Sequence, residues 1–319
     1  MLRFFNFPRV VLDEVIRCMN PLDLITVSQC SKRSLTLLQY LISHKPYALE
    51  IRSDCSISIC NEDQKYIIKA WDKDMISNDV VKRDCPKSTL DELKFVIFEF
   101  KKGEILTLWD NRFQGFCSLY QHFIAIYKKP IRFLNLNFVH RFQRTLDILS
   151  LVYQNQNRIE KCKVIINDSP TQDVNIIFDA LQAVDHMSIW IDTKIPNRKY
   201  EYKSIQVHPS QSVTVPHLLN MNCDKVSIDR GKYSCRHVNL YLKQWILNDV
   251  PRVKEVSLEK EYFDLSESLT DIPHVETKNR SKLDAQFTNI VGTAYDILRC
   301  DGVIATVFGY SIRLGKRRS

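Results

Sequence analysis

Few side chains in this 319-residue sequence have the types and spacing that covalent catalysis requires. Cys117 and His122 bring a thiol and an imidazole base close together in the chain, which is the pairing that activates a cysteine nucleophile. On the helix that we expect here, a separation of five residues turns the two side chains in different directions, and no orienting acidic residue is evident. We therefore expect both residues to pack in the core or lie on the surface, and we predict no catalytic residue.

Metal ligands and phosphate-binding loops are equally hard to find. Cys223, Cys235 and His237 are the nearest approach to a zinc cluster, but structural zinc sites usually hold cysteines in tight pairs, and the sequence has no Cys-x-x-Cys. A glycine-rich phosphate loop needs closely spaced glycines, and only seven glycines occur in the whole chain. The sequence therefore predicts no metal and no cofactor, and it favours buried, structural cysteines.

The ten cysteines are scattered, and several sit in apolar runs, where a reduced thiol behaves as a small hydrophobic group. The first apolar run reaches Asp13 and Glu14 too early for a secretory signal, and no stretch of ~18 uncharged residues could span a bilayer. A reducing compartment, the cytoplasm or the nucleus, fits this usage of cysteine best, and we expect no membrane contact.

The net charge of +8 comes from 45 basic and 37 acidic residues that are spread along the chain. Lysines occur as pairs such as Lys101-Lys102, and a basic block appears only at 316–318. A protein that binds nucleic acid usually concentrates its basic residues in one stripe. The charge pattern therefore argues against a nucleic-acid partner.

The elements that would position a functional surface are clearest in the first part of the chain. A first helix is expected to begin near Pro8 or Arg9, because proline suits the first turn, where its missing N–H would be unpaired anyway. Asn20 can cap a second helix that has Pro21 in its first position. Ser31 can cap a third helix, so three short helices are predicted.

These helices carry more apolar side chains than they can bury against one another. The apolar stripes are formed by Val11, Val15 and Cys18, by Leu12, Ile16 and Met19, and, in the second helix, by Leu22, Leu24, Ile25 and Val27. Contiguous exposed apolar surface usually marks an interaction site. Periodicity alone leaves two alternatives open, which are a docking surface and stripes that the rest of the chain covers.

The order of residues in this segment resembles an F-box. Phe7-Pro8 precedes an apolar helix, Asn20-Pro21-Leu22-Asp23-Leu24 opens the next helix, and Val27-Ser28 and Cys30-Ser31-Lys32-Arg33 lead into the third, with no gap in the spacing. Phe7 stands in place of the usual leucine and keeps its bulk. Ser34 stands where many members of the family carry a tryptophan, which removes an anchor from the core of the module.

The resemblance implies both a partner and a surface. The partner would be a Skp-type adaptor, which joins the chain to the cullin and the RING protein of an SCF ubiquitin ligase. The nine residues that would contact the adaptor are Phe7, Pro8, Val11, Leu12, Val15, Ile16, Leu22, Leu24 and Val27. The F-box would occupy residues 1–46, and any ligase activity would come from the partners, because the chain has no zinc-ligand pairs for a RING domain.

The rest of the chain alternates between strand and helix patterns. Apolar runs of period two predict short strands between residues 47 and 110. After residue 112, helical patterns lie at about 115–127, 142–154, 174–184 and 238–247, and strand patterns at about 131–138, 162–167, 187–192, 225–229 and 254–259. This alternation predicts an α/β fold with a mainly parallel sheet, in irregular βα units like those of a leucine-rich repeat. A β-hairpin with a type I′ turn at Asp301-Gly302 is expected near its end.

Two further segments resemble the F-box-associated domain of the large F-box family that is expanded in nematodes. They are MNCDKVSIDR (221–230) with the following HVNLYLKQW, and the C-terminal AYDILRCDGVIATVFGYSIRL (294–314). The resemblance spans most of residues 90–313 and implies an α/β domain over 47–319 that captures a target protein, without naming the target. In this domain Trp245 would be a buried anchor of its helix.

These features together predict a non-catalytic substrate receptor that holds a target protein for an SCF ligase. The alternative is a repeat-type scaffold or nucleic-acid-binding protein without ligase association, whose N-terminal helices only cap the sheet. Binding to RNA or DNA that falls steeply with added salt would favour the alternative. Poor solubility that co-expression of the adaptor relieves would favour the receptor. An enzyme is the third reading, and only a measured activity would support it.

Overall fold

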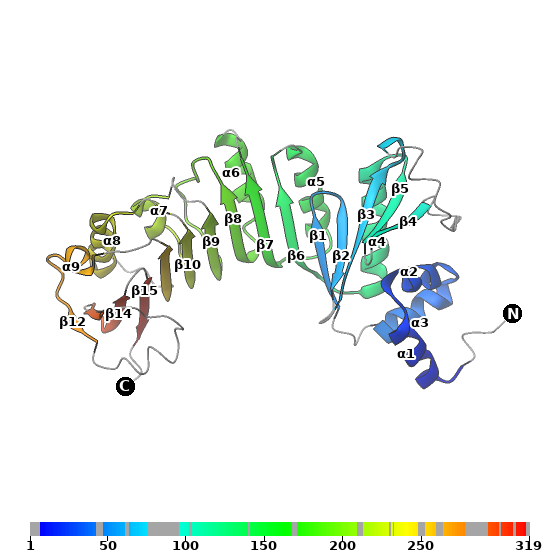
Figure 1. The fold of residues 1–319 in the computed structure, drawn as a ribbon, viewed down its shortest axis with the longest axis horizontal. Helices are drawn as coiled ribbons and strands as arrows, with labels where there is room; N and C mark the ends of the chain where they lie inside the picture. The colour runs from blue at the N-terminus through cyan, green and yellow to red at the C-terminus, as the bar shows by residue number, and fades with distance from the viewer. Residues whose placement is uncertain are drawn as a thin grey trace. The chain divides into compact units, whose positions relative to one another are not determined.

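The structure is a computed structural model in which a group of helices is followed by alternating strands and helices (Figure 1). It describes residues 7–42, 47–60, 64–75, 96–101, 104–139, 141–167, 171–208, 213–229, 231, 233–247, 253–259, 264–277, 293–299, 301–308 and 311–316. The chain divides into two compact units. The first unit is Met1–Asn135 with Gln143–Ile159, and the second is Leu136–Phe142 with Glu160–Ser319.

The first unit begins with three short helices, which are α1 (Arg9–Cys18), α2 (Pro21–Gln29) and α3 (Lys32–Ile42). The predicted cap of α2 is present, because Oδ1 of Asn20 accepts the backbone N–H of Asp23 (3.0 Å) and the Asp23 carboxylate accepts the backbone N–H of Asn20 (3.1 Å). Oγ of Ser31 likewise accepts the backbone N–H of Ser34 (3.0 Å) and caps α3. Each bond satisfies a donor that a helix end leaves unpaired, which explains why the helices begin where the sequence predicts.

Ser34 occupies the core position where the family resemblance leads one to expect a tryptophan. Its side chain is fully buried, and its hydroxyl forms a hydrogen bond with the hydroxyl of Ser31 (2.7 Å). Further along α3, the apolar residues Leu38, Leu41 and Ile42 are all buried. The small residue therefore contributes to the cap rather than to the apolar core.

Two polar contacts join these helices to α4 (Arg112–Tyr127). Oγ of Ser28 donates to the carbonyl oxygen of Ile25 (2.5 Å), so it is free to accept the Nε2–H of His122 at 2.9 Å. Nε2 of Gln39 donates to the carbonyl oxygen of Ala125 at 2.7 Å. One contact from α2 and one from α3 therefore attach the three-helix group to α4.

The sheet of the first unit has the strand order β6-β1-β2-β3-β5-β4. Its strands are β1 (Ala48–Arg52), β2 (Ser56–Cys60), β3 (Lys65–Asp72), β4 (Val96–Lys101), β5 (Glu104–Trp109) and β6 (Ile131–Asn137). Strands β1, β2 and β3 pair antiparallel, whereas β1 with β6 and β3 with β5 pair parallel. Helices α4 and α5 (Phe142–Tyr153) pack on one side of these strands, where Phe116 and Phe123 are buried (Figure 1).

The sheet of the second unit has the order β12-β13-β14-β15-β11-β10-β9-β8-β7. The strands β7 (Ile159–Ile166), β8 (Val184–Ile191), β9 (Ser204–His208), β10 (Lys225–Asp229) and β11 (Glu255–Glu259) alternate with the helices α6 (Thr171–Ala180), α7 (Val215–Leu219) and α8 (Cys235–Leu247). The pairs β8–β9, β9–β10 and β10–β11 are parallel. Parallel neighbours need a crossover connection, and α7 and α8 lie in the connections from β9 to β10 and from β10 to β11.

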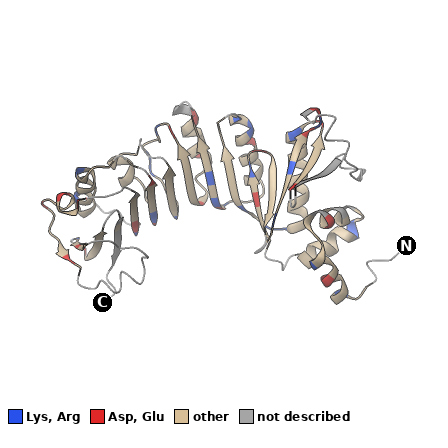
Figure 2. Ribbon diagram, in the orientation of Figure 1, with Lys and Arg blue, Asp and Glu red and all other residues tan. Residues whose placement is uncertain are grey.

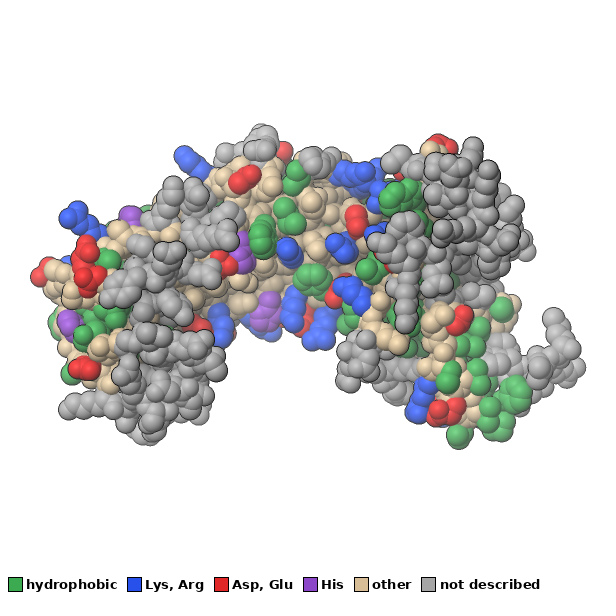
Figure 3. Space-filling model, viewed as in Figure 1, with side chains coloured by type: hydrophobic (Ala, Val, Ile, Leu, Met, Phe, Trp, Pro, Cys, Tyr) green, Lys and Arg blue, Asp and Glu red, His purple; other side chains and the backbone are tan. Residues whose placement is uncertain are grey.

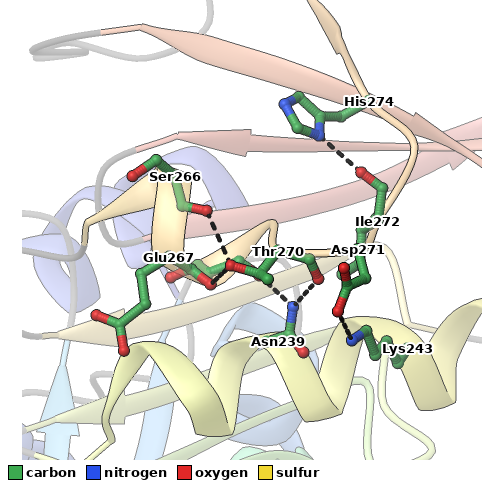
Figure 4. Close-up of polar contacts among 9 residues, drawn as sticks. Asn239, Lys243, Ser266, Glu267, Thr270, Asp271, Ile272 and His274 are labelled. Atoms are coloured by element: carbon green, nitrogen blue, oxygen red, sulfur yellow. Dashed lines mark hydrogen bonds and ion pairs between the residues drawn. The ribbon is translucent and has the colours of Figure 1, made fainter.

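A short helix, α9 (Leu265–Ser268), is fastened to α8 by side-chain contacts (Figure 4). Nδ2 of Asn239 donates to the carbonyl oxygens of Ser268 (3.0 Å) and Thr270 (2.8 Å). Lys243, one turn further along α8, forms an ion pair with Asp271 at 3.5 Å. The two contacts hold the end of α9 against α8.

The C-terminal strands are β12 (Val275–Glu276), β13 (Ala294–Leu298), β14 (Val303–Phe308) and β15 (Ser311–Lys316), and they pair antiparallel. The predicted hairpin between β13 and β14 is confirmed, but the predicted type I′ turn is wrong. The backbone N–H of Gly302 donates to the carbonyl oxygen of Arg299 (3.0 Å), so the turn runs from Arg299 to Gly302, whereas the predicted type I′ turn would have Asp301 and Gly302 as its two central residues. The Asp301 carboxylate instead accepts hydrogen bonds from Arg299, which hold the pKa of Asp301 at about 2.

The α/β alternation is confirmed, and so is the burial of Trp245, which is 1% exposed. The sequence did not predict β9 or α7. The segments between β8 and β10 are short, and Pro196 and Asn197 break the strand and helix pattern there. In the sequence, the segment Asp84–Ser88 with Pro86 also suggests a surface loop, and it lies outside the described residues. The likeness to a leucine-rich repeat and the division into residues 1–46 and 47–319 stay predictions.

Candidate docking surface on the N-terminal helices

Helix α1 carries the outermost apolar side chains of the N-terminal group. Pro8 stands at the N-cap position and Arg9 is the first helical residue, as the fixed φ of proline favours. The guanidinium of Arg9 lies 4.5 Å from the centre of the Tyr40 ring, which ties the start of α1 to α3. Glu14 and Arg17 form an ion pair (2.9 Å) on the solvent side of the helix.

The nine residues predicted to contact an adaptor fall into different environments. Leu12, Ile16 and Leu24 are buried within the chain. Phe7 and Val11 are 40% and 42% exposed, and Pro8 is exposed as well. Val15 and Val27 are half-buried, and the side chain of Leu22 lies outside the described residues.

Burial divides these residues because α1 has two apolar stripes and only one of them faces the other helices. Leu12 and Ile16, four residues apart, form the inner stripe and pack in the core. Val11, Val15 and Cys18 form the neighbouring stripe, in which Val11 and Cys18 are exposed. The buried residues therefore fix the position of α1, and only the outer stripe is accessible to a partner.

The structure adds one residue that the periodicity argument missed. Val10 is 74% exposed, which is unusual for a valine in a helix beside a core. It lies off both stripes, so the helical pattern gave no reason to choose it. The signal that could have identified Val10 is an apolar residue in line with the charged residues Glu14 and Arg17.

We define the α1 surface as Phe7, Pro8, Val10, Val11, Val15 and Cys18. Figure 3 shows hydrophobic side chains gathered over α1 on the viewed face. Figure 2 shows acidic and basic positions on the same helices, and on α1 these include Asp13, Glu14 and Arg17. An apolar patch with a charged rim is the usual anatomy of a protein–protein contact.

The alternative chemical sites do not assemble. Burial and the neighbouring Cys55 raise the pKa of the Cys117 thiol, so it is not an activated nucleophile, and His122 is engaged with Ser28. Burial lowers the pKa of His122 as well. These two residues contribute to packing, as expected.

The candidate zinc ligands are likewise occupied elsewhere. Cys223 is buried and its thiol points to the carbonyl oxygen of Tyr200 (3.6 Å), while Nδ1 of His237 faces the backbone N–H of Ser234 (3.1 Å). Across the described part of the chain, no three His, Cys, Asp or Glu residues are grouped as a metal site. Nor does any helix in those ranges have the length and apolar character needed to cross a membrane.

Two models of known families match segments of the chain. A family model described as an F-box domain matches residues 4–45, and a second model, described as F-box associated, matches residues 193–258. The chain carries an F-box and an F-box-associated domain. The F-box match contains α1, α2 and α3, and the F-box-associated match contains β9, α7, β10, α8 and most of β11.

The chain is also similar to the Caenorhabditis elegans protein F59B2.9, which is itself described as uncharacterized. The two are 21% identical over 268 residues, which is 80% of this chain and 61% of the relative. The chain therefore spans less than two thirds of the length of this curated relative. No solved structure matches the chain.

Proposed function

We propose that this F-box protein is a non-catalytic substrate receptor of an SCF ubiquitin ligase. Its F-box binds a Skp-type adaptor, and the α/β region over residues 47–319 holds a target protein. The observation that carries the proposal is the α1 surface, because it presents exposed apolar side chains within the segment that the F-box model matches. The F-box-associated match supports the target-binding half of the proposal.

The contribution of the α1 surface to binding follows from its exposed apolar area. Complete burial of a valine side chain contributes roughly 1.5–2 kcal/mol. Val10 and Val11 are 74% and 42% exposed, so covering both contributes roughly 2 kcal/mol in total, or about thirtyfold in Kd. Phe7 and Val15 add to this, and part of the sum is lost to the cost of association.

The buried residues of the predicted surface have a different task in this proposal. Leu12 and Ile16 hold α1 against the other helices, and Leu24 holds α2. Replacing any of them would remove adaptor binding by unfolding the module. A test of the docking surface therefore needs substitutions at exposed positions.

The test is co-purification of the chain with a Skp-type adaptor, using the double variant Val10→Asp, Val11→Asp. Both positions lie in the first turn of α1, where a negative charge favours the helix dipole, so the variant keeps its helix. The matched control is Val275→Asp, Leu298→Asp, because these residues are 66% and 67% exposed in the second unit. We expect a stoichiometric complex for the wild type and the control, and at least a hundredfold weaker complex for the α1 variant.

The proposal fails if the wild type shows no binding at micromolar concentrations, or if the α1 variant binds as tightly as the control. Circular dichroism of both variants shows whether the fold is intact. In either case the apolar side chains of α1 have another role, and the scaffold alternative replaces the proposal of a substrate receptor.

A further inference from the structure

Within the described residues of the second unit, the parallel strands have a buried apolar face and a polar face. Side chains on β8, β9 and β10 alternate between the two faces, as a strand requires. The outward residues are His186, Ser188 and Trp190 on β8, Ser204, Gln206 and His208 on β9, and Lys225, Ser227 and Asp229 on β10. Parallel sheets are usually covered on both faces, so a polar face with an accessible tryptophan calls for an explanation.

Four side chains on four neighbouring strands of this face form a continuous line, which we call the Trp190 row. The rings of Trp190 and His208 stack with their centroids 4.7 Å apart, and Nζ of Lys163 lies 4.7 Å from the centre of the Trp190 ring. Nδ1 of His208 contacts the carboxylate of Asp229. The parallel register places Trp190 directly opposite His208, and β7, which carries Lys163, lies next to β8.

The groups at the two ends of the Trp190 row differ in how many polar partners they have. The Asp229 carboxylate also accepts from Nε2 of Gln206 (3.4 Å) and Oγ of Ser227 (3.4 Å), and its side chain is only 18% exposed. Within the described residues, Lys163 has no carboxylate partner and the indole N–H of Trp190 has no acceptor. Trp190 is nevertheless 42% exposed.

This arrangement selects for a particular ligand chemistry. His208 stacks on the indole, and Lys163 lies near the ring from the strand on the other side of β8, so less of the ring is left for a nucleic-acid base to stack on. The indole carries an N–H donor, and the Lys163 ammonium group lies 4.7 Å from the ring centre; two such donors suit a carboxylate. Lys161, two residues away on the same face of β7, is half-exposed and forms an ion pair with Glu160 at 3.8 Å. Figure 3 shows basic, histidine and hydrophobic side chains close together over the strands in the middle of the view.

We propose that the Trp190 row is the target-binding site of this F-box protein and that it binds an acidic peptide segment. A glutamate or aspartate of the target accepts hydrogen bonds from Nζ of Lys163 and the indole N–H of Trp190. Charge complementarity supports this occupant, because the Lys163 ammonium group stands at one end of the row, while the Asp229 carboxylate at the other end already accepts hydrogen bonds from Gln206 and Ser227. The inference rests on the proposed function and names the kind of target that the receptor takes.

The test measures the binding of the full chain to a fluorescein-labelled decaglutamate peptide by fluorescence anisotropy. The decisive variant is Lys163→Glu, and its matched control is Lys199→Glu, at a lysine that is 66% exposed in the loop before β9. Both substitutions change the net charge equally, so a difference between them measures the site and not the overall field. We expect Lys163→Glu to raise Kd at least tenfold and Lys199→Glu to raise it less than threefold.

Substitutions of the tryptophan separate its ring from its N–H group. Trp190→Phe keeps an aromatic ring over Lys163 and removes the donor, so we expect an increase in Kd of about threefold. Trp190→Ala removes both and should raise Kd about tenfold. Equal losses for Lys163→Glu and Lys199→Glu, or no binding of decaglutamate up to about 1 mM, would overturn the proposal. So would a labelled ten-nucleotide uridine RNA that binds more tightly than decaglutamate and depends on Trp190.

The same variants distinguish a failure of this site from a failure of the proposed function. Lys163 and Trp190 lie in the second unit and α1 lies in the first, so Lys163→Glu should leave co-purification with the adaptor unchanged. If the adaptor does not bind the wild type but decaglutamate binding depends on Lys163, the ligase role falls and the peptide site stands.

Discussion

Gly115, on the first turn of α4, is predicted to tolerate no side chain, and the variant Gly115→Ala tests this. A Cβ atom there would lie 2.5 Å from Cδ1 of the Trp109 indole and closer still to Cγ, well inside van der Waals contact. The ring cannot turn away without cost, because its Nε1–H donates to Oγ1 of Thr107 (2.8 Å), which in turn donates to the carbonyl oxygen of Lys69 (3.0 Å). Gly115 is therefore required by the close approach of α4 to β5.

Two opposing effects decide the magnitude. Replacing glycine by alanine inside a helix stabilises it by up to about 1 kcal/mol. Overpacking a filled core costs about 1–3 kcal/mol, and displacing the indole loses a hydrogen bond that contributes about 1 kcal/mol. The net expectation is a loss of about 1–3 kcal/mol, which would lower the Tm of the first unit by several degrees.

The assay is thermal unfolding of the full chain, followed by circular dichroism. Gln121→Ala is the control, because Gln121 is an exposed residue of α4 and its replacement should leave Tm almost unchanged. Combining Gly115→Ala with Trp109→Leu should reduce the cost of the alanine, because the smaller side chain removes the clash. A Gly115→Ala variant that is as stable as the wild type, or more stable, would show that α4 does not approach Trp109 this closely.

Two further predictions concern contacts that join helices. Burial lowers the pKa of His122 below its ordinary value of about 6.5, so the unfolded chain binds more protons than the folded chain at mildly acidic pH, and stability falls as the pH drops below about 6.5. His122→Gln should therefore lose less stability than the wild type between pH 7.5 and 5.5 in urea unfolding, and an identical loss would contradict the burial of this histidine. Asn239→Ala should cost about 1–2 kcal/mol, because two carbonyl groups of the α9 turn lose their donor. Hydrogen exchange at residues 264–272 should then become faster, whereas Lys243→Ala, which removes only an exposed ion pair, should leave it nearly unchanged.

Much of the local structure could be predicted from the sequence because its causes are local. Asn20 and Ser31 cap helices through hydrogen bonds to residues three positions away, and the short strands between residues 47 and 110 follow from period-two apolar runs. The hairpin near Asp301-Gly302 was predicted correctly, but the type of its turn was not. The Arg299 side chain holds the Asp301 carboxylate, a contact that the dipeptide alone does not reveal.

The candidate docking residues show where the local argument ends. The spacing of Val11 and Leu12 predicts two apolar stripes on α1 but cannot say which of them the other helices cover. Packing buried Leu12 and left Val11 exposed, and it left Val10 more exposed than either. The choice depends on the angle at which α1 meets α2 and α3, and no pattern within α1 encodes that angle.

The sequence by itself determined most of the elements, the helix caps and the motif order that the F-box model recognises, because each depends on residues that are close together in the chain. Only the tertiary structure decided which residues far apart in the chain meet. The attachment of Ser28 to His122 joins residues 94 positions apart, and the Trp190 row draws on four strands whose register sets its spacing. Pairing of this kind is selected by the packing of whole elements, and so it leaves no periodic signal in the sequence.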